Sequence, residues 1–211
     1  MRTDAEARQQ IVDISNDLFA MGHLTPTGGN VSARGADPDC LWITPSQMYK
    51  GNLCAETLVC IHEDGSVVEG TTKPSIEFQM HWQSYRARED ATAAVHTHSP
   101  AATAFGITNQ KFPPINTDAI FLADTRIVPW FMPGSKELAD AVEEALKVSR
   151  GAILQCHGLM AVGKTMRDAA NRAMMLEETA RLVLYTKQFG GEVTLIPDEW
   201  VARLASVSNF L

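Results

Sequence analysis

Two apolar segments of this chain end in histidine, and this feature most limits how the chain can fold. Residues 91–95 lead into His96-Thr97-His98, and residues 152–156 lead into His157. Residues two apart in a β-strand project from the same face, so His96 and His98 share one face. A single histidine on such a strand is more often a hydrogen-bonded core residue than a ligand. Three together predict a metal site at a strand edge, with coordination positions left open for a substrate.

The composition sets the class of protein. A chain of 211 residues is long enough for one domain, 1–211, with a sizeable core. The net charge of −7 argues against a nucleic-acid-binding surface but leaves room for a local basic pocket that takes an anionic substrate. No segment approaches the roughly 18 to 20 apolar residues of a membrane span. The acidic N-terminus lacks the apolar core of a signal peptide. We therefore expect a small-molecule substrate, and neither a nucleic acid nor a membrane as partner.

The cysteines indicate a cytoplasmic protein. Cys40, Cys54, Cys60 and Cys156 form no CxxC pair and no regular framework, which is typical of reduced thiols. Cys156 precedes His157 on the predicted strand, so its side chain should point to the opposite face and stay out of the metal site.

The apolar periodicity predicts an α/β fold. Helical spacing covers residues 3–21, a segment from Pro74 to about residue 86, and residues 100–105, 135–148 and 165–189, with a final helix after Pro197. Strands are expected at 40–44, 58–61, 67–69, 93–98, 151–157 and 159–163, with one or two more within 112–128. The strands come first as hairpins and then alternate with helices, which favours a single, mostly antiparallel sheet covered by helices.

Glu77 is the carboxylate we associate with the histidines. It is expected in the first turn of the helix that Pro74 opens, where the helix dipole favours a carboxylate even without a function. Its functional interpretation is a fourth metal ligand or a general acid/base beside the metal. His81 lies one turn further on the same face, so Glu77 and His81 form a rival ligand pair. A core or interface role is the more ordinary one for His81.

A glycine-rich turn, Gly28-Gly29-Asn30, leads into residues 31–34. Backbone N–H groups in such loops bind phosphates and other oxyanions. A tight turn without a ligand is the common alternative. Thr44, Ser46 and Ser75 would add hydroxyl groups to the same pocket, although each is also ordinary in a turn.

These motifs occur together in a known family. The segments Thr27-Gly28-Gly29-Asn30-Val31-Ser32, Ile43-Thr44-Pro45-Ser46, Lys73-Pro74-Ser75-Ile76-Glu77, Val95-His96-Thr97-His98 and Gln155-Cys156-His157-Gly158-Leu159 resemble, in order and spacing, the class II aldolase/adducin family. The likeness spans nearly the whole chain and is greatest to the L-fuculose-phosphate aldolase branch.

The resemblance carries several expectations. It implies a three-layer α/β/α fold around a mostly antiparallel sheet, and C4 tetramers with active sites between subunits. It implies one divalent ion per subunit, zinc first and manganese or cobalt otherwise, held by residues matching His96, His98 and His157. The residue matching Glu77 would act as ligand and acid/base. A substrate phosphate would be bound at Gly28, Asn30, Thr44, Ser46 and Ser75.

The chain departs from that aldolase pattern in three places. Gln47 follows Ser46 where the aldolases have glycine, and Ile76 replaces the second serine before the glutamate. No tyrosine follows Pro114 where the aldolases place a catalytic one. Asp118 instead resembles the acid/base aspartate of the related ribulose-phosphate epimerases, with a turn or strand-end role as its alternative.

The sequence therefore predicts a divalent-metal-dependent carbon–carbon lyase of the aldolase type. Its substrate would be a small hydroxy-keto compound, a sugar phosphate, and the cation would stabilise the enediolate left by cleavage while Glu77 moves the proton. The alternatives are a decarboxylase of a keto or hydroxy-aromatic acid, and a sugar-phosphate epimerase or dehydratase. A non-catalytic adducin-type module is disfavoured by the complete histidine set. Arg126 and Trp130 are open candidates for the pocket lining.

Overall fold

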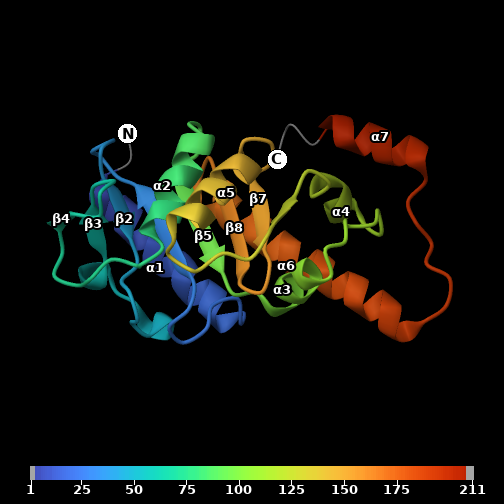
Figure 1. Cartoon of the computed structure of the whole chain (residues 1–211), viewed down its shortest axis with the longest axis horizontal. Helices are drawn as coiled ribbons and strands as arrows, with labels where there is room; N and C mark the ends of the chain where they lie inside the picture. Colours follow the sequence, from blue (N-terminus) through green and yellow to red (C-terminus); the bar gives the residue numbers. More distant parts are fainter. Residues whose placement is uncertain (1–2, 208–211) are drawn as a thin grey trace.

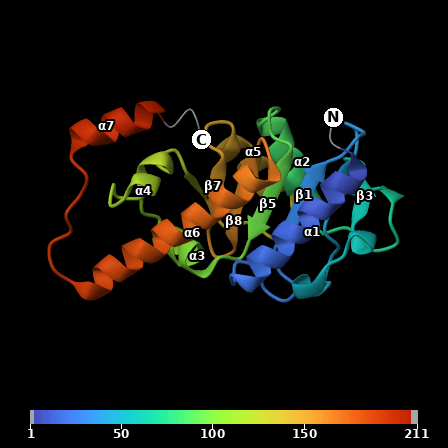
Figure 2. The ribbon, with the colours of Figure 1, turned by 180° about the vertical axis from the view of Figure 1, so that it is seen from behind.

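One sheet lies between two layers of helices (Figures 1 and 2). The computed structural model describes residues 3–207, so residues 1–2 and 208–211 of the expected 1–211 domain lie outside the described part. The eight strands follow the order β4-β3-β2-β1-β5-β8-β7-β6. All neighbours pair antiparallel except β6 and β7. The strands are β1 (Asn30–Arg34), β2 (Leu41–Ile43), β3 (Val59–Ile61), β4 (Val67–Glu69), β5 (Ala93–Thr97), β6 (Arg126–Val128), β7 (Gly151–Leu154) and β8 (Gly158–Gly163).

The helices divide between the two faces. In Figure 1, α2 and α5 lie in front of the sheet, and in Figure 2 α1 and α6 cover the opposite face. The α7 helix lies apart from the sheet, beside α4. This arrangement confirms the predicted three-layer α/β/α fold. The helices are α1 (Asp4–Ala20), α2 (Phe78–Ala87), α3 (Pro100–Ile107), α4 (Thr117–Phe121), α5 (Lys136–Leu146), α6 (Met166–Phe189) and α7 (Asp198–Val207), with 3-10 turns η1 (Lys50–Asn52) and η2 (Ala55–Thr57).

Two hydrophobic cores fill the spaces on either side of the sheet. On β5, Val95 belongs to the core under α1, α3 and α6, whereas Ala94 belongs to the core under α2 and α5. Because side chains alternate along a strand, His96 lies on the same face as Ala94. On β1, Val31 packs on the α1 side, so Asn30 faces α2. Asn30 and His96 are register partners, which places them side by side beneath α2.

The α2 helix begins later than the sequence predicts. Pro74 does not open it, because Pro74 forms an isolated bridge with Pro45 and the Ser75 N–H donates to the Thr44 carbonyl. These contacts hold the segment extended, and α2 starts at Phe78 with Glu77 as its N-cap residue. Glu77 therefore sits at the entrance to the helix, one position before its first turn.

Two further segments differ from expectation. Within residues 112–128 the structure has a single strand, β6, and the short helix α4, which begins because the Asn116 side chain accepts a hydrogen bond from the Ala119 N–H. The strand predicted to end at His157 ends at Leu154. Cys156 adopts a left-handed backbone (φ 57°) and turns the chain toward β8, so His157 lies in a turn.

All four cysteines are free. Among residues 3–207, no helix combines the length and the apolar character that a membrane crossing requires.

Candidate functional site

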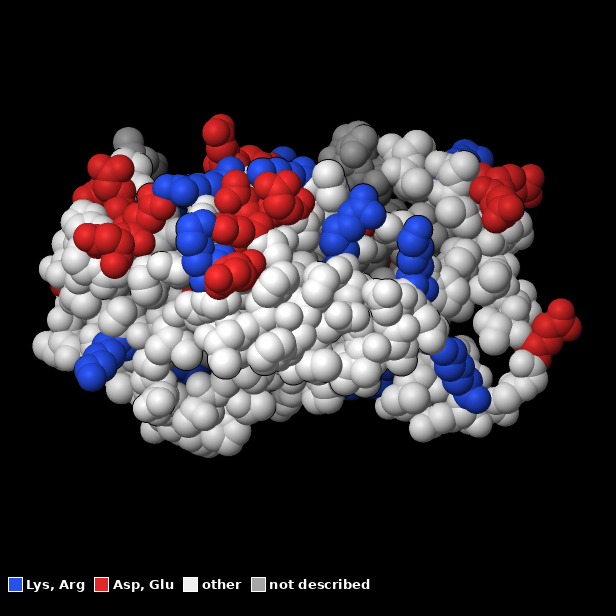
Figure 3. Space-filling model, in the orientation of Figure 1, with Lys and Arg blue, Asp and Glu red and all other residues white. Residues whose placement is uncertain are grey.

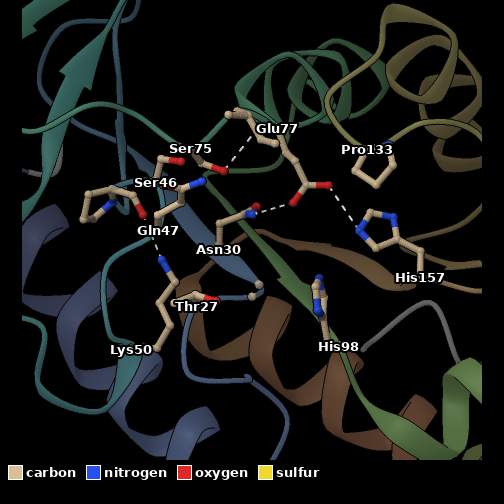
Figure 4. Close-up of a pocket in the computed structure, with 14 residues that line it drawn as sticks. Thr27, Asn30, Ser46, Gln47, Lys50, Ser75, Glu77, His98, Pro133 and His157 are labelled. Atoms are coloured by element: carbon tan, nitrogen blue, oxygen red, sulfur yellow. Dashed lines mark hydrogen bonds and ion pairs between the residues drawn. The ribbon is translucent and has the colours of Figure 1, made fainter.

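Glu77, His96, His98 and His157 converge although they are far apart in sequence. One ligand atom from each lies within 4.8 Å of the others. Glu77 Oε2 is 3.3 Å from His96 Nε2, Glu77 Oε1 is 3.3 Å from His157 Nε2, and the Nε2 atoms of His96 and His98 are 3.1 Å apart. Figure 4 shows Glu77, His98 and His157 facing the same space. The structure thus brings all four predicted metal-site residues together.

Two glycines let these side chains approach one another. A Cβ on Gly158 would lie 2.0 Å from the Thr97 carbonyl oxygen, so only glycine allows β8 to pass this close to β5. A Cβ on Gly28 would lie 2.5 Å from His98 Nδ1. Gly28 therefore fits against the imidazole of His98, and the glycine-rich turn forms one wall of the site.

His96 is held in the tautomer that a metal ligand needs. Its Nδ1 lies 2.9 Å from the Leu159 carbonyl, which can only accept, so Nδ1 carries the proton and the Nε2 lone pair faces Glu77. Burial lowers the pKa of His96 to about 3, and burial likewise lowers the pKa of His98. Both imidazoles are therefore neutral near neutral pH, the form in which histidine binds metals.

Glu77 is a buried carboxylate whose two oxygens differ. Oε2 accepts a 2.7 Å hydrogen bond from the Asn30 amide, whereas Oε1 has no hydrogen-bond donor among the described residues. Burial acts to raise the pKa of Glu77, but the imidazoles of His96 and His157 and the Asn30 amide outweigh it and hold the pKa below the usual range. An ionised carboxylate oxygen without a donor, beside three imidazoles, fits a divalent cation such as zinc, manganese or cobalt.

A chain of buried hydrogen bonds orients Asn30. Asn30 Oδ1 lies 2.5 Å from His81 Nε2, His81 Nδ1 lies 2.6 Å from Ser32 Oγ, and Ser32 Oγ lies 2.9 Å from the Tyr85 hydroxyl. Because the Asn30 amide donates to Glu77, its oxygen must accept from His81 Nε2–H. His81 Nδ1 then accepts from Ser32, and Ser32 accepts from Tyr85. Burial lowers the pKa of His81 to about 3, in agreement with this neutral form.

His81 is therefore not placed with the metal-site residues. Both of its ring nitrogens are engaged by Asn30 and Ser32, and it lies outside the four-residue cluster. The rival Glu77/His81 ligand pair does not form in this structure.

A pocket opens beside the cluster (Figure 4). Of the residues predicted to bind substrate, Gly28, Asn30, Ser46 and Ser75 line it. Thr44 does not, since its hydroxyl oxygen is buried and accepts from the Val31 N–H. The lining is Thr27, Gly28, Gly29, Asn30, Pro45, Ser46, Gln47, Lys50, Ser75, Ile76, Glu77, His98, Pro133 and His157.

Asp118 lies away from this pocket. It belongs to α4, which packs against α6 and α7, and it does not line the pocket. Arg126 and Trp130 do not line it either. Within one copy of the chain, Asp118 therefore does not face the metal-site cluster.

Several residues that line the pocket were not among the predicted site residues, and Gln47 and Lys50 are the two with the most unusual surroundings. Gln47 has a left-handed backbone (φ 55°), a conformation that glycine adopts more easily. Lys50 is 1% exposed, although nothing in the surrounding sequence distinguishes it from a surface lysine. Only the tertiary structure shows that its side chain points into the pocket.

Known proteins resemble this chain over most of its length. A sequence model described as the class II aldolase and adducin N-terminal domain matches residues 9–184. The 5-deoxy-D-ribulose 1-phosphate aldolase of Bacillus thuringiensis serovar kurstaki is 34% identical over 199 residues, which cover 94% of this chain and 93% of that protein.

Two solved structures share the fold. An L-fuculose 1-phosphate aldolase has a TM-score of 0.85 and 28% identity, with 95% of this chain and 94% of that chain covered. YgbL from Klebsiella pneumoniae, whose description leaves its activity open between aldolase, epimerase and decarboxylase, has a TM-score of 0.86 and 28% identity, covering 97% and 100%. These matches confirm the resemblance read from the motifs: the chain belongs to the class II aldolase and adducin family.

Proposed function

We propose that this protein is a divalent-metal-dependent aldolase that cleaves a carbon–carbon bond in a small hydroxy-keto sugar phosphate. The observation that carries the proposal is the convergence of His96, His98, His157 and Glu77 beside an open pocket. The names of the relatives support the reaction class, because two of them are sugar-phosphate aldolases.

The proposed roles follow from the geometry. The three imidazoles and Glu77 would hold zinc, or manganese or cobalt, and the cation would polarise the substrate carbonyl and stabilise the negative charge that develops on cleavage. Asn30 keeps Glu77 Oε2 engaged, so Oε1 is the atom free to take a proton from the substrate and return it. Gly28, Ser46 and Ser75 line the part of the pocket where a substrate phosphate would bind. Thr44 would hold Ser75 in place, because its carbonyl accepts a hydrogen bond from the Ser75 N–H.

We further propose a single domain over residues 1–211, a cytoplasmic location and a C4 tetramer. The position of Asp118 supports an assembly with active sites between subunits. Because it does not line the pocket of its own chain, its proposed acid/base role requires a neighbouring copy.

Elemental analysis of the purified protein tests the metal site. We expect about one transition-metal ion per chain, and loss of that metal in the His96→Ala/His98→Ala double variant. The metal-loaded protein should release an aldehyde from ketose 1-phosphates. Absence of metal after soaking with zinc or manganese would overturn the enzyme proposal and favour a binding module.

The second candidate is a metal-dependent decarboxylase of a keto or hydroxy-aromatic acid. It is favoured by Gln47 and Ile76, which replace phosphate-loop residues of the aldolases, and by the similarity to YgbL. Release of carbon dioxide from a candidate acid, with no aldehyde from sugar phosphates, would support it over the aldolase. Interconversion or dehydration of a sugar phosphate without carbon–carbon cleavage would instead indicate an epimerase or dehydratase.

A further inference from the structure

Lys50 is a buried ammonium group for which the described residues supply no counter-ion. Its side chain is 1% exposed, and no carboxylate among residues 3–207 lies within ion-pair distance of Nζ. Among the described residues, the side chain makes one hydrogen bond, from Nζ to the Pro45 carbonyl oxygen at 2.8 Å (Figure 4). An ammonium has three N–H donors, so two remain. Buried charges without partners are costly, which indicates that a partner arrives with a ligand.

The backbone holds Lys50 between the two loops of the pocket. Its N–H donates to the Pro26 carbonyl of the glycine-rich loop, and its Nζ donates to Pro45 of the Thr44–Gln47 turn. The side chain therefore enters the pocket where these loops meet. Ser46 and Ser75 line the same space and carry hydroxyl groups, which also bind oxyanions.

We infer that Lys50 supplies the positive charge that binds a terminal phosphate of the substrate, an inference that rests on the sugar-phosphate function proposed above. A phosphate accepts several donors at once, and an ammonium with neighbouring hydroxyls provides them. The lysine also compensates for the hydroxyl donor that is missing at Ile76. A carboxylate substrate, by contrast, would need fewer donors than this group of side chains presents.

The burial of Lys50 gives phosphate binding a characteristic pH dependence. Burial lowers the pKa of Lys50 to about 8, although the charge of Glu77 acts in the opposite direction. A lysine with a lowered pKa is charged below that value and neutral above it. Phosphate affinity should therefore be full below about pH 8 and fall as pH rises through that value. The phosphate itself, with a second pKa of about 6, is already a dianion in this range.

The test compares Lys50→Met with Lys73→Met in the metal-loaded protein. Lys73 lies in the adjoining loop, but its side chain is exposed and does not line the pocket. For Lys50→Met we expect KM for a sugar phosphate and the inhibition constant of inorganic phosphate to rise roughly 10- to 100-fold, with kcat changed far less. Lys73→Met should match the wild type in all three.

Calorimetric binding of inorganic phosphate to the wild-type protein needs neither activity nor a variant. We expect weaker binding as pH passes through about 8, and at least about tenfold weaker binding of acetate than of phosphate at lower pH. Any of three results would overturn the inference. Phosphate could bind Lys50→Met as tightly as the wild type, its affinity could be the same at every pH, or acetate could bind as tightly as phosphate.

These results separate the two proposals. Lys50-dependent phosphate binding without aldehyde release from any sugar phosphate would sustain the role of Lys50 and overturn the aldolase reaction. Aldehyde release from a sugar phosphate, with the same phosphate inhibition constant in Lys50→Met as in the wild type, would sustain the aldolase reaction and overturn the role of Lys50.

Discussion

The carboxylate of Glu77 shows how a single residue acquires a role from its surroundings. One oxygen is fixed by the Asn30 amide, while the other has no donor and faces His157. The amide can play this part only if it does not flip. The His81 Nε2–H prevents the flip, because it donates a hydrogen bond to Asn30 Oδ1 and so fixes which end of the amide faces Glu77. His81 thus orients Glu77 indirectly, through the Asn30 side chain.

The first prediction concerns His81 as a positioning residue. In His81→Leu the Asn30 amide loses the donor that fixes it, so kcat should fall about 10- to 100-fold while KM changes little. His81→Gln retains an N–H donor and should recover much of the lost kcat. Steady-state kinetics of the two metal-loaded variants provide the measurement. If kcat fell equally in both variants, or if only KM changed, His81 would serve packing alone.

The second prediction concerns Gly28→Ala. The backbone of Gly28 is not left-handed, so it would accept alanine, but the added Cβ would lie 2.5 Å from both His98 Nδ1 and Thr25 Oγ1. The imidazole of His98 must move, and metal affinity should drop about tenfold or more. Thr27→Ala, in the same loop, is the control and should bind metal as the wild type does. A chelator titration of both variants checks this, and equal affinities would contradict it.

At the scale of helices and strands, some boundaries followed from sequence and others did not. The Thr3 and Thr165 capping boxes are local signals, and α1 and α6 begin where those residues predict. The start of α2 is set by long-range pairing of Pro74 with Pro45, which no local pattern reveals. The site divides in the same way. The histidine motifs could be recognised in the sequence, whereas the burial of Lys50 depends on the tertiary structure and could not be predicted locally.

The third prediction concerns the junction of α3 with α6. Ser99, the N-cap of α3, makes no side-chain cap, and Glu177 of α6 instead accepts from the N–H groups of Ala101 and Ala102 and pairs with Arg181. Glu177 is 1% exposed, so Glu177→Ala removes the acceptor of one buried and one partly buried backbone N–H. It should lower the free energy of unfolding by about 2 to 3 kcal/mol.

Glu178→Ala is the matched control for that change. Glu178 pairs with the same arginine, but its side chain is 59% exposed, and exposed pairs contribute about 0 to 1 kcal/mol. Urea unfolding of both variants compares the two values. If Glu178→Ala were as destabilising as Glu177→Ala, the capping of α3 would not be the source of the stability.

At the scale of the whole molecule, an apolar rim lies next to the pocket. Ile76 and Pro133 line the pocket, and Ile76, Trp130 and Met132 are each more than half exposed. Acidic and basic side chains gather along the upper part of the face in Figure 3, and a broad surface without them crosses its middle. An exposed apolar rim of this kind is where a second copy of the chain would be expected to pack. The proposed tetramer, with Asp118 acting between subunits, requires that copy to carry its own α4 to this pocket.

The last prediction tests that assembly through mixed oligomers. Glu77→Gln and Asp118→Asn should each abolish most activity in the homo-oligomer. If each active site combines Glu77 of one copy with Asp118 of another, an oligomer co-expressed from both variants contains sites with neither substitution. Random mixing in equal amounts makes about a quarter of the sites intact, so about a quarter of wild-type activity should return.

Three outcomes are informative about the assembly. Light scattering of the wild type should give four chains per particle, and a monomer would exclude shared sites. Full activity in the Asp118→Asn homo-oligomer would remove Asp118 from the reaction and leave the turn role that α4 already gives it. An inactive mixture of two inactive variants would place both residues in the same copy's site. That result would require α4 to move toward the pocket, because in the structure Asp118 lies outside it.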